Sequence, residues 1–212
     1  MDRSARKDAI SAMHKENILL AAEGLFAAKG VEATTMDEIA RIAEYSKRTV
    51  YVYFGSKEEI YYSIILKGIT LLKDYITEGL DAQVGFLFRY QALCRKLVDY
   101  YIATPFHFAA IVNFQTRPLQ ALSGSQVEQD IFRVGEEINV TLEGLLENGK
   151  REGVLQPELL VKPTIFIYWS SLSSLILLAN HKSSYIEETM NISSRELLEY
   201  GFQLLSGMVI KK

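Results

Sequence analysis

The sequence predicts an all-α protein. Apolar residues recur at helical spacing through almost the whole chain, no segment alternates like a strand, and hydroxyl residues stand where several helices would begin. With 49% hydrophobic residues among 212, the chain can bury a substantial core. We expect an N-terminal three-helix domain at residues 1–55, joined by a long helix to a larger helical domain at 56–212.

The first helix is predicted from Arg6 or Ala9 to Lys29, with Gly30 as its stop. Its apolar positions fall at i, i+4, i+7 and i+8, which makes one face of the helix apolar. Together with the two short helices that follow, this face is expected to form a core of Leu25, Phe26, Ile39, Ile42, Val50 and Phe54.

Hydroxyl residues mark the next three helix starts. Thr35 with Glu38 forms a capping box, Ser46 opens the following segment, and Ser56 with Glu59 forms a second capping box. Two short helices joined by a tight turn are typical of a helix-turn-helix, in which the second helix enters the DNA major groove.

The helix after Ser46 carries residues suited to that groove. Val50 and Phe54 are spaced to be buried, so the other side chains occupy the remaining arc. Cations there suit phosphates, while hydroxyls and rings suit base edges. Lys57 and the backbone N–H of Thr35 are expected to bind phosphates as well. The expected DNA-binding residues are Thr35, Lys47, Arg48, Thr49, Tyr51, Tyr53 and Lys57.

The charge balance limits how this surface binds DNA. Net charge is −3, and residues 1–57 hold nine Lys or Arg against eight Asp or Glu. Bulk electrostatic affinity should therefore be modest, and binding must rely on a few placed contacts. Arg3, Arg6 and Lys7 form either a phosphate-binding arm or a solvated tail.

Helices continue through the second domain. The long helix is predicted at 56–79 and the next at 84–104, where Pro105 opens a short helix capped by Thr104. A loop at 119–126 precedes a helix at 125–151. Two last helices, at 163–180 and 194–210, are expected to flank a polar loop, and Ser193 with Glu196 forms a capping box.

The N-terminal region resembles the TetR family of bacterial transcriptional regulators, most strongly from Ile18 to Ile64. The resemblance rests on Thr34-Thr35, Ile39-Ala40, Ser46, Thr49-Val50-Tyr51, Tyr53-Phe54 and Ser56-Lys57-Glu58. One residue departs from the pattern, because the family usually has glycine where Glu44 stands. That turn position commonly adopts the left-handed conformation, which costs a non-glycine residue roughly 1 kcal/mol or more.

The resemblance implies an effector pocket among the middle helices. The expected lining, for which ordinary core packing is the alternative, is Phe86, Tyr90, Tyr101, His107, Phe108, Asn113 and Trp169. It also implies that the last two helices pair with their copies in a homodimer. The expected interface, for which an intrachain core is the alternative, is Leu172, Leu175, Ile176, Leu197, Gly201, Leu204, Leu205 and Met208.

Several classes of protein are disfavoured. The three histidines lie on separate predicted elements with no metal-ligand spacing, and there is no phosphate loop and no nucleophile with a base, so we expect no enzyme, metal or cofactor.

The lone Cys94 cannot form an intrachain disulfide and is either a buried apolar residue or a reactive thiol. Residues 1–15 lack a signal-like apolar region, and 165–179 is too short to span a membrane. A cytoplasmic protein is expected.

The sequence thus predicts a ligand-responsive transcriptional regulator, a repressor that binds a palindromic DNA operator as a dimer and is released by a small-molecule effector. The alternative is a helical DNA-binding or protein-interaction module that senses no small molecule.

Overall fold

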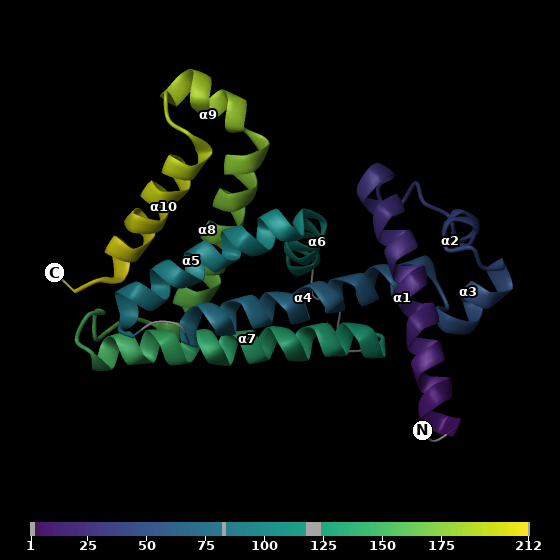
Figure 1. Ribbon diagram of the computed structural model, residues 1–212. Coiled ribbons are helices and arrows are strands. Elements are labelled where there is room, and N and C mark those ends of the chain that lie inside the picture. Colours follow the sequence, from purple (N-terminus) through teal and green to yellow (C-terminus); the bar gives the residue numbers. More distant parts are fainter. Residues whose placement is uncertain (1–2, 82–83, 118–123, 212) are drawn as a thin grey trace. The chain divides into compact units, whose positions relative to one another are not determined.

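The computed structural model describes residues 3–81, 84–117 and 124–211, and within them the chain forms ten α-helices (Figure 1). The first four are α1 Arg3–Lys29, α2 Met36–Ile42, α3 Lys47–Tyr53 and α4 Lys57–Asp81. The others are α5 Phe86–Ala103, α6 Pro105–Gln115, α7 Gln126–Arg151, α8 Val161–His181, α9 Ser183–Met190 and α10 Ser194–Val209. The predicted all-α class is confirmed. Of the expected loop at 119–126, residues 119–123 lie outside the described residues.

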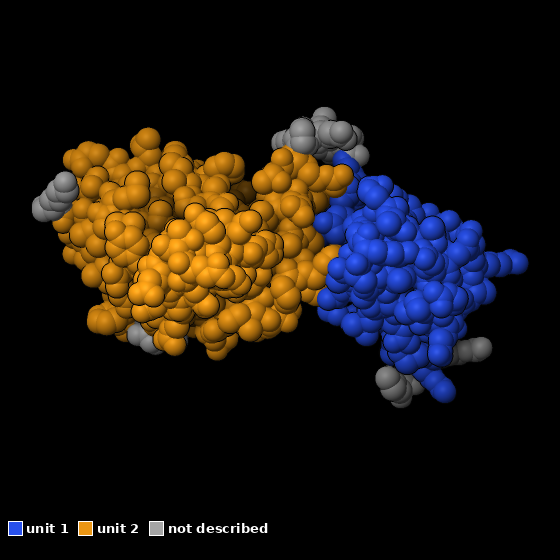
Figure 2. All heavy atoms as spheres, turned by 90° about the horizontal axis from the view of Figure 1, so that it is seen from above, with its two compact units in different colours: residues 1–68, 118–131 blue, residues 69–117, 132–212 orange. Residues whose placement is uncertain are grey.

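The helices form two compact units, coloured separately in Figure 2. Unit 1 comprises residues 1–68 and 118–131, and unit 2 comprises 69–117 and 132–212. Helices α4 and α7 each contribute residues to both units. The division into functional domains at 55/56 remains a prediction.

Unit 1 buries the apolar faces of its first helices together. Ile18 and Phe26 of α1 are buried, as are Ile39 of α2 and Val50 of α3. The prediction that Ile42 joins this core is wrong, since its side chain is 47% exposed. Helix α2 buries Ile39 and Ala40, and the rotation of about 100° per residue turns Ile42 away from the face centred on them.

The turn between α2 and α3 has left-handed geometry. Glu44 has φ 60°, as expected from the family resemblance. The N–H of Tyr45 donates to the Ala40 carbonyl at 2.9 Å and that of Glu44 to the Arg41 carbonyl at 3.3 Å, the two bonds of a Schellman motif. The same motif ends α7 with a glycine, Gly153, at the left-handed position. Glu44 thus fills a position whose geometry favours glycine.

Unit 2 is joined by contacts between segments distant in the sequence. Helix α10 packs on α8 and α5. Beyond the end of α7, Glu152 accepts a hydrogen bond of 2.8 Å from the N–H of Phe86, and so supplies the start of α5 with a cap that Gly85 cannot. The N–H of Lys211 donates to the Val154 carbonyl at 2.9 Å, which fixes the end of the chain to the connector after α7.

Two local expectations in unit 2 are wrong. The Thr104 hydroxyl does not cap α6, because it donates instead to the Tyr100 carbonyl of the preceding helix at 2.9 Å. The expected polar loop between the last two long helices contains α9, which is anchored by the buried side chain of Ile186 and ends at Asn191 in the left-handed conformation. The capping box of Ser193 and Glu196 is present as predicted.

Helix α8 is, in the described part of the chain, the one helix long and apolar enough to cross a membrane by length and composition. Its most apolar stretch has a mean hydropathy of 1.3, and 28% of it is buried. The same properties suit a helix with one face in a protein core, and α8 buries Leu172 and Ile176 in this way.

Two glycines of α7 test the packing of unit 2. A Cβ at Gly149 would lie 2.7 Å from Phe86 Cδ2 and 2.8 Å from Leu155 Cδ1, and both of these side chains are buried. We expect Gly149→Ala to lower the free energy of unfolding by about 1–3 kcal/mol through overpacking. Gly144 of the same helix has no atom within 4 Å of that position. The matched Gly144→Ala should raise stability by about 0.5–1 kcal/mol in urea unfolding, and equal effects of the two would contradict this packing.

Candidate functional site

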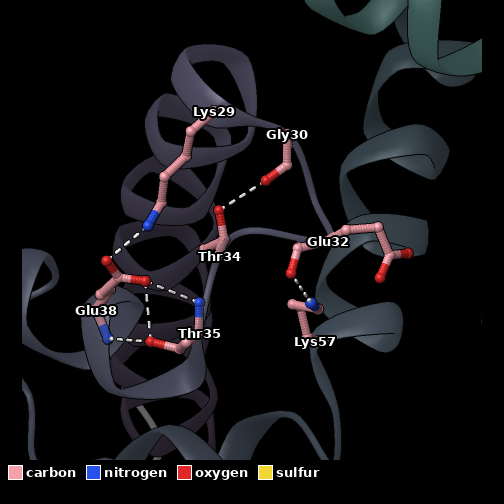
Figure 3. A network of polar contacts seen from close by, with 7 residues as sticks. All are labelled: Lys29, Gly30, Glu32, Thr34, Thr35, Glu38 and Lys57. Atoms are coloured by element: carbon pink, nitrogen blue, oxygen red, sulfur yellow. Dashed lines mark hydrogen bonds and ion pairs between the residues drawn. The ribbon is translucent and has the colours of Figure 1, made fainter.

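A capping network fixes the start of α2 (Figure 3). The Glu38 carboxylate accepts from the Thr35 N–H at 2.9 Å and pairs with Lys29 Nζ at 2.6 Å, while the Glu38 N–H donates to Thr35 Oγ1 at 3.3 Å. The Lys29 ammonium, followed by the Thr35 bonds, lowers the pKa of Glu38 to about 2. The predicted capping box is confirmed.

This network bears on the predicted phosphate ligands. The backbone N–H of Thr35, expected to bind a phosphate, already donates to Glu38. Lys57 Nζ donates to the Glu32 carbonyl at 3.2 Å, so it bridges the start of α4 and the connection between α1 and α2 (Figure 3). In this structure both groups form hydrogen bonds within unit 1.

Helix α3 begins at the predicted cap. Ser46 Oγ accepts from the Thr49 N–H at 3.0 Å, and the two hydroxyls lie 2.7 Å apart, so the Thr49 side chain is engaged in the cap. Val50 and Phe54 are buried as expected. The side chains exposed on α3 are Lys47, Arg48, Tyr51 and Val52.

The cations of α3 differ in their surroundings. Lys47 Nζ lies 2.9 Å from Asp37 of α2, and this exposed pair raises the pKa of the lysine. Arg48 is exposed and makes no salt bridge with any described residue. Arg48 is therefore the α3 cation most ready to bind an external anion. The apolar Val52, which was not among the predicted contacts, is 74% exposed on the same helix.

Tyr45 anchors the turn to α1. Its hydroxyl lies 2.6 Å from His14 Nδ1 and accepts from Asn17 Nδ2 at 3.3 Å. The ring of Tyr53, at the end of α3, lies 5.6 Å from the His14 ring between centroids and is only half exposed. Tyr53 thus contributes to the docking of α3 as well as to its predicted DNA face. Sequence reasoning did not identify His14 or Tyr45 in this role.

Unit 2 contains an apolar cavity of about 40 Å³ between α4, α5, α7 and α8. Its wall is formed by Ile76, Tyr90, Leu93, Leu97, Leu142, Leu145, Leu146, Ile165, Tyr168, Trp169 and Leu172. Two predicted pocket residues, Tyr90 and Trp169, line it. The other five do not: Phe86, Tyr101, His107 and Phe108 are buried in the packing of α5 and α6, and Asn113 is exposed.

The predicted dimer residues differ in how far they are exposed on the subunit. Leu172 and Ile176 are buried within the subunit and cannot form an outer surface, because their side chains pack inward from α8. Gly201 faces Leu175 across the contact between α10 and α8. Leu197 and Leu205 are half-buried, whereas Leu204 and Met208 are exposed. The exposed apolar side chains of these two helices are Phe166, Ile167, Leu178, Tyr200, Leu204 and Met208.

Within the residues that the structure describes, no three His, Cys, Asp or Glu side chains are grouped so as to hold a metal ion. Cys94 is buried, and this burial raises the pKa of its thiol to about 12. The site is instead a short exposed helix in a capped helix-turn-helix, which defines a DNA-binding regulator as the class of protein.

Comparisons with known proteins also indicate a transcription regulator. Residues 18–64 match the family of bacterial regulatory proteins described as the tetR family. The chain is 27% identical to the transcriptional regulator YhgD of Bacillus subtilis, covering 68% of this chain and 72% of that protein. It is 25% identical to the transcriptional repressor NicS of Pseudomonas putida, covering 69% and 68%.

Solved structures share the fold. The fatty acid degradation regulator FadR of Bacillus halodurans has a TM-score of 0.68 at 20% identity, over 92% of this chain and 95% of that one. The ketosteroid regulator KstR2 of Mycobacterium tuberculosis has a TM-score of 0.66 at 20% identity, over 93% and 95%. Residues 18–64 thus carry the N-terminal segment of the TetR family of bacterial regulatory proteins, and the curated relatives are transcriptional regulators.

The Glu38 network makes stability depend on pH. Because its pKa falls from the ordinary 4.5 to about 2 on folding, Glu38 stabilises the fold above pH 4.5, and this contribution is lost as pH falls toward 2. We expect the stability difference between the wild type and Glu38→Gln to shrink across this window in urea unfolding. Glu58→Gln, which removes an exposed carboxylate from α4, controls for general loss of charge. A difference that stays constant with pH would overturn the assignment.

Proposed function

We propose that the chain is a cytoplasmic repressor that binds a palindromic operator as a homodimer and leaves DNA when a small-molecule effector binds unit 2. The observation that carries the DNA-binding part is the exposed face of α3, where Arg48, Lys47 and Tyr51 stand free of the core on a helix fixed by its cap and by Tyr45. A short helix with cations and a ring on its outer face suits the major groove.

The predicted DNA contacts are unequal in this proposal. Arg48 and Tyr51 are the main base or phosphate ligands. Lys47 must first exchange Asp37 for a phosphate, which limits its net contribution. Thr49 and Tyr53 act mainly by holding α3, and Thr35 and Lys57 act mainly at the edge of the motif.

Effector response rests on the cavity and on the continuity of α4. This helix starts at Lys57, directly after the reading motif, and its later residue Ile76 lines the cavity. A ligand that favours one position of α4 would change the separation of two recognition helices, which must lie roughly 34–36 Å apart to read successive major grooves.

The small volume of the cavity favours a second candidate function, a DNA-binding module that senses no small molecule.

Dimerisation is proposed through the exposed apolar faces of α8 and α10. Phe166 is 76% exposed and Met208 68%, and both lie on helices whose other faces are already packed together. A second copy of the chain would remove these side chains from water. Compared with the sequence-based interface, this surface gains Phe166, Ile167, Leu178 and Tyr200 and loses Leu172 and Ile176.

Substitution of Arg48 tests DNA reading. Fragments that the protein selects from genomic DNA supply the operator for fluorescence anisotropy. Loss of one good base contact costs about 1–3 kcal/mol, so Arg48→Ala should weaken binding roughly 5- to 150-fold. If Arg48 binds a phosphate instead, the slope of affinity against salt should fall by about 1. Arg95→Ala, an exposed arginine of α5, should leave both unchanged. Unchanged affinity and slope in a combined Lys47, Arg48 and Tyr51 alanine variant would sink the proposal.

Charge insertion tests the dimer. Phe166→Lys combined with Met208→Lys places unpaired charges in the proposed interface, where burial costs several kcal/mol per charge. We expect sedimentation to give a dimer for the wild type and a monomer for this variant. Val140→Lys, at a 67% exposed site on α7, is the matched control and should remain dimeric. A wild type that sediments as one chain at all concentrations would rule out the interface.

A further inference from the structure

The cavity of unit 2 is walled only by apolar atoms. Its eleven lining residues include no Asp, Glu, Lys, Arg or His, and six of them are leucines. We infer that this cavity binds an uncharged hydrophobic molecule and holds it by burial alone, without a hydrogen bond or ion pair. This inference rests on the proposed ligand response and names the chemical class of the ligand.

The polar ends of the lining side chains are used elsewhere. The Tyr90 hydroxyl donates to the Phe202 carbonyl of α10 at 3.0 Å, and the Tyr168 hydroxyl donates to the Leu205 carbonyl of the same helix. Trp169 Nε1 donates to Gln115 Oε1 at the end of α6. A ligand inside the cavity therefore meets the carbon faces of these three rings, and their hydrogen-bonding groups are not turned toward it.

The surroundings also penalise charge. Cys94 interacts electrostatically with Tyr90 and Tyr168, and burial raises the pKa of its thiol. Burial likewise raises the pKa of both tyrosines. A carboxylate or ammonium in the cavity would lose its hydration with no partner in return. A charged head group is thus excluded, whereas a hydrocarbon or aromatic ring gains by leaving water.

The cavity must widen to accept a ring. About 40 Å³ is less than an aromatic ring needs, and the walls offer no polar partner to a water molecule. Leu93, Leu142 and Leu146 are among the leucines of the wall, whose side chains can change rotamer more cheaply than backbone can move. A ligand would therefore make room by turning leucine side chains of the wall.

Trp169 reports on the cavity directly, because it is the single tryptophan of the chain and lines the wall. We would titrate the DNA-free full-length protein with toluene, benzoate and benzylammonium at neutral pH, three molecules of similar ring but different charge, and follow tryptophan fluorescence. We expect a saturable change with toluene and binding at least about tenfold weaker for both ions. Equal binding of an ion, or no saturable change with toluene, overturns the inference.

Variants that fill the cavity supply the control. Leu145→Phe should abolish the toluene response, and Leu142→Phe serves the same purpose if circular dichroism shows that the first variant does not fold. Leu160→Phe, at a 70% exposed site outside the wall, should respond as the wild type does. A response that survives in a folded cavity-filled variant places toluene elsewhere and contradicts the inference.

The experiments test the ligand class and the regulatory function separately, so that one can be rejected while the other stands. If toluene saturates the cavity but leaves the affinity for selected DNA unchanged, the ligand class stands and release of DNA through this cavity is rejected. If the protein binds its DNA but toluene gives no response, the DNA-binding function stands and the ligand class is rejected.

Discussion

Helices α2 and α3 have seven residues each, too few to be stable alone, so the whole reading surface depends on their docking to α1. The docking combines burial with two specific attachments. Ile39 and Val50 pack into the core that Ile18 and Phe26 begin, while Tyr45 bonds His14 at the turn. Caps at Thr35 and Ser46 then fix where each helix starts. The direction in which Arg48 points is therefore a property of unit 1 and not of α3 alone.

In unit 2 the ring and the hydroxyl of each tyrosine at the cavity contact different parts of the protein. The rings of Tyr90 and Tyr168 wall the cavity, and their hydroxyls bond carbonyls within α10, which also offers the exposed apolar face of the proposed dimer. A change in the cavity that tilts either ring must stretch or redirect a bond to that helix. This gives the cavity a second physical connection to other parts of the protein, beside the continuity of α4.

The sequence predicts the ends of helices better than it predicts their neighbours. Caps such as Thr35, Ser46 and Ser193, and a stop such as Gly30, act within a few residues and were located correctly. Periodicity, by contrast, identifies an apolar stripe without naming what covers it. Leu172 and Ile176 therefore looked like interface residues but face inward, and Ile42 looked like core but faces outward. The cavity lies where several helices meet, and most of its leucines have no local signal that separates them from ordinary core.

Glu44 has a consequence for how the motif folds. A glycine at this position would let the turn adopt its left-handed shape early, in a chain that is still largely unfolded. Glutamate disfavours that shape until the Schellman bonds at Ala40 and Arg41 and the attachment of Tyr45 are in place. The left-handed shape of the turn is therefore held by these contacts and not by the intrinsic preference of its own residue.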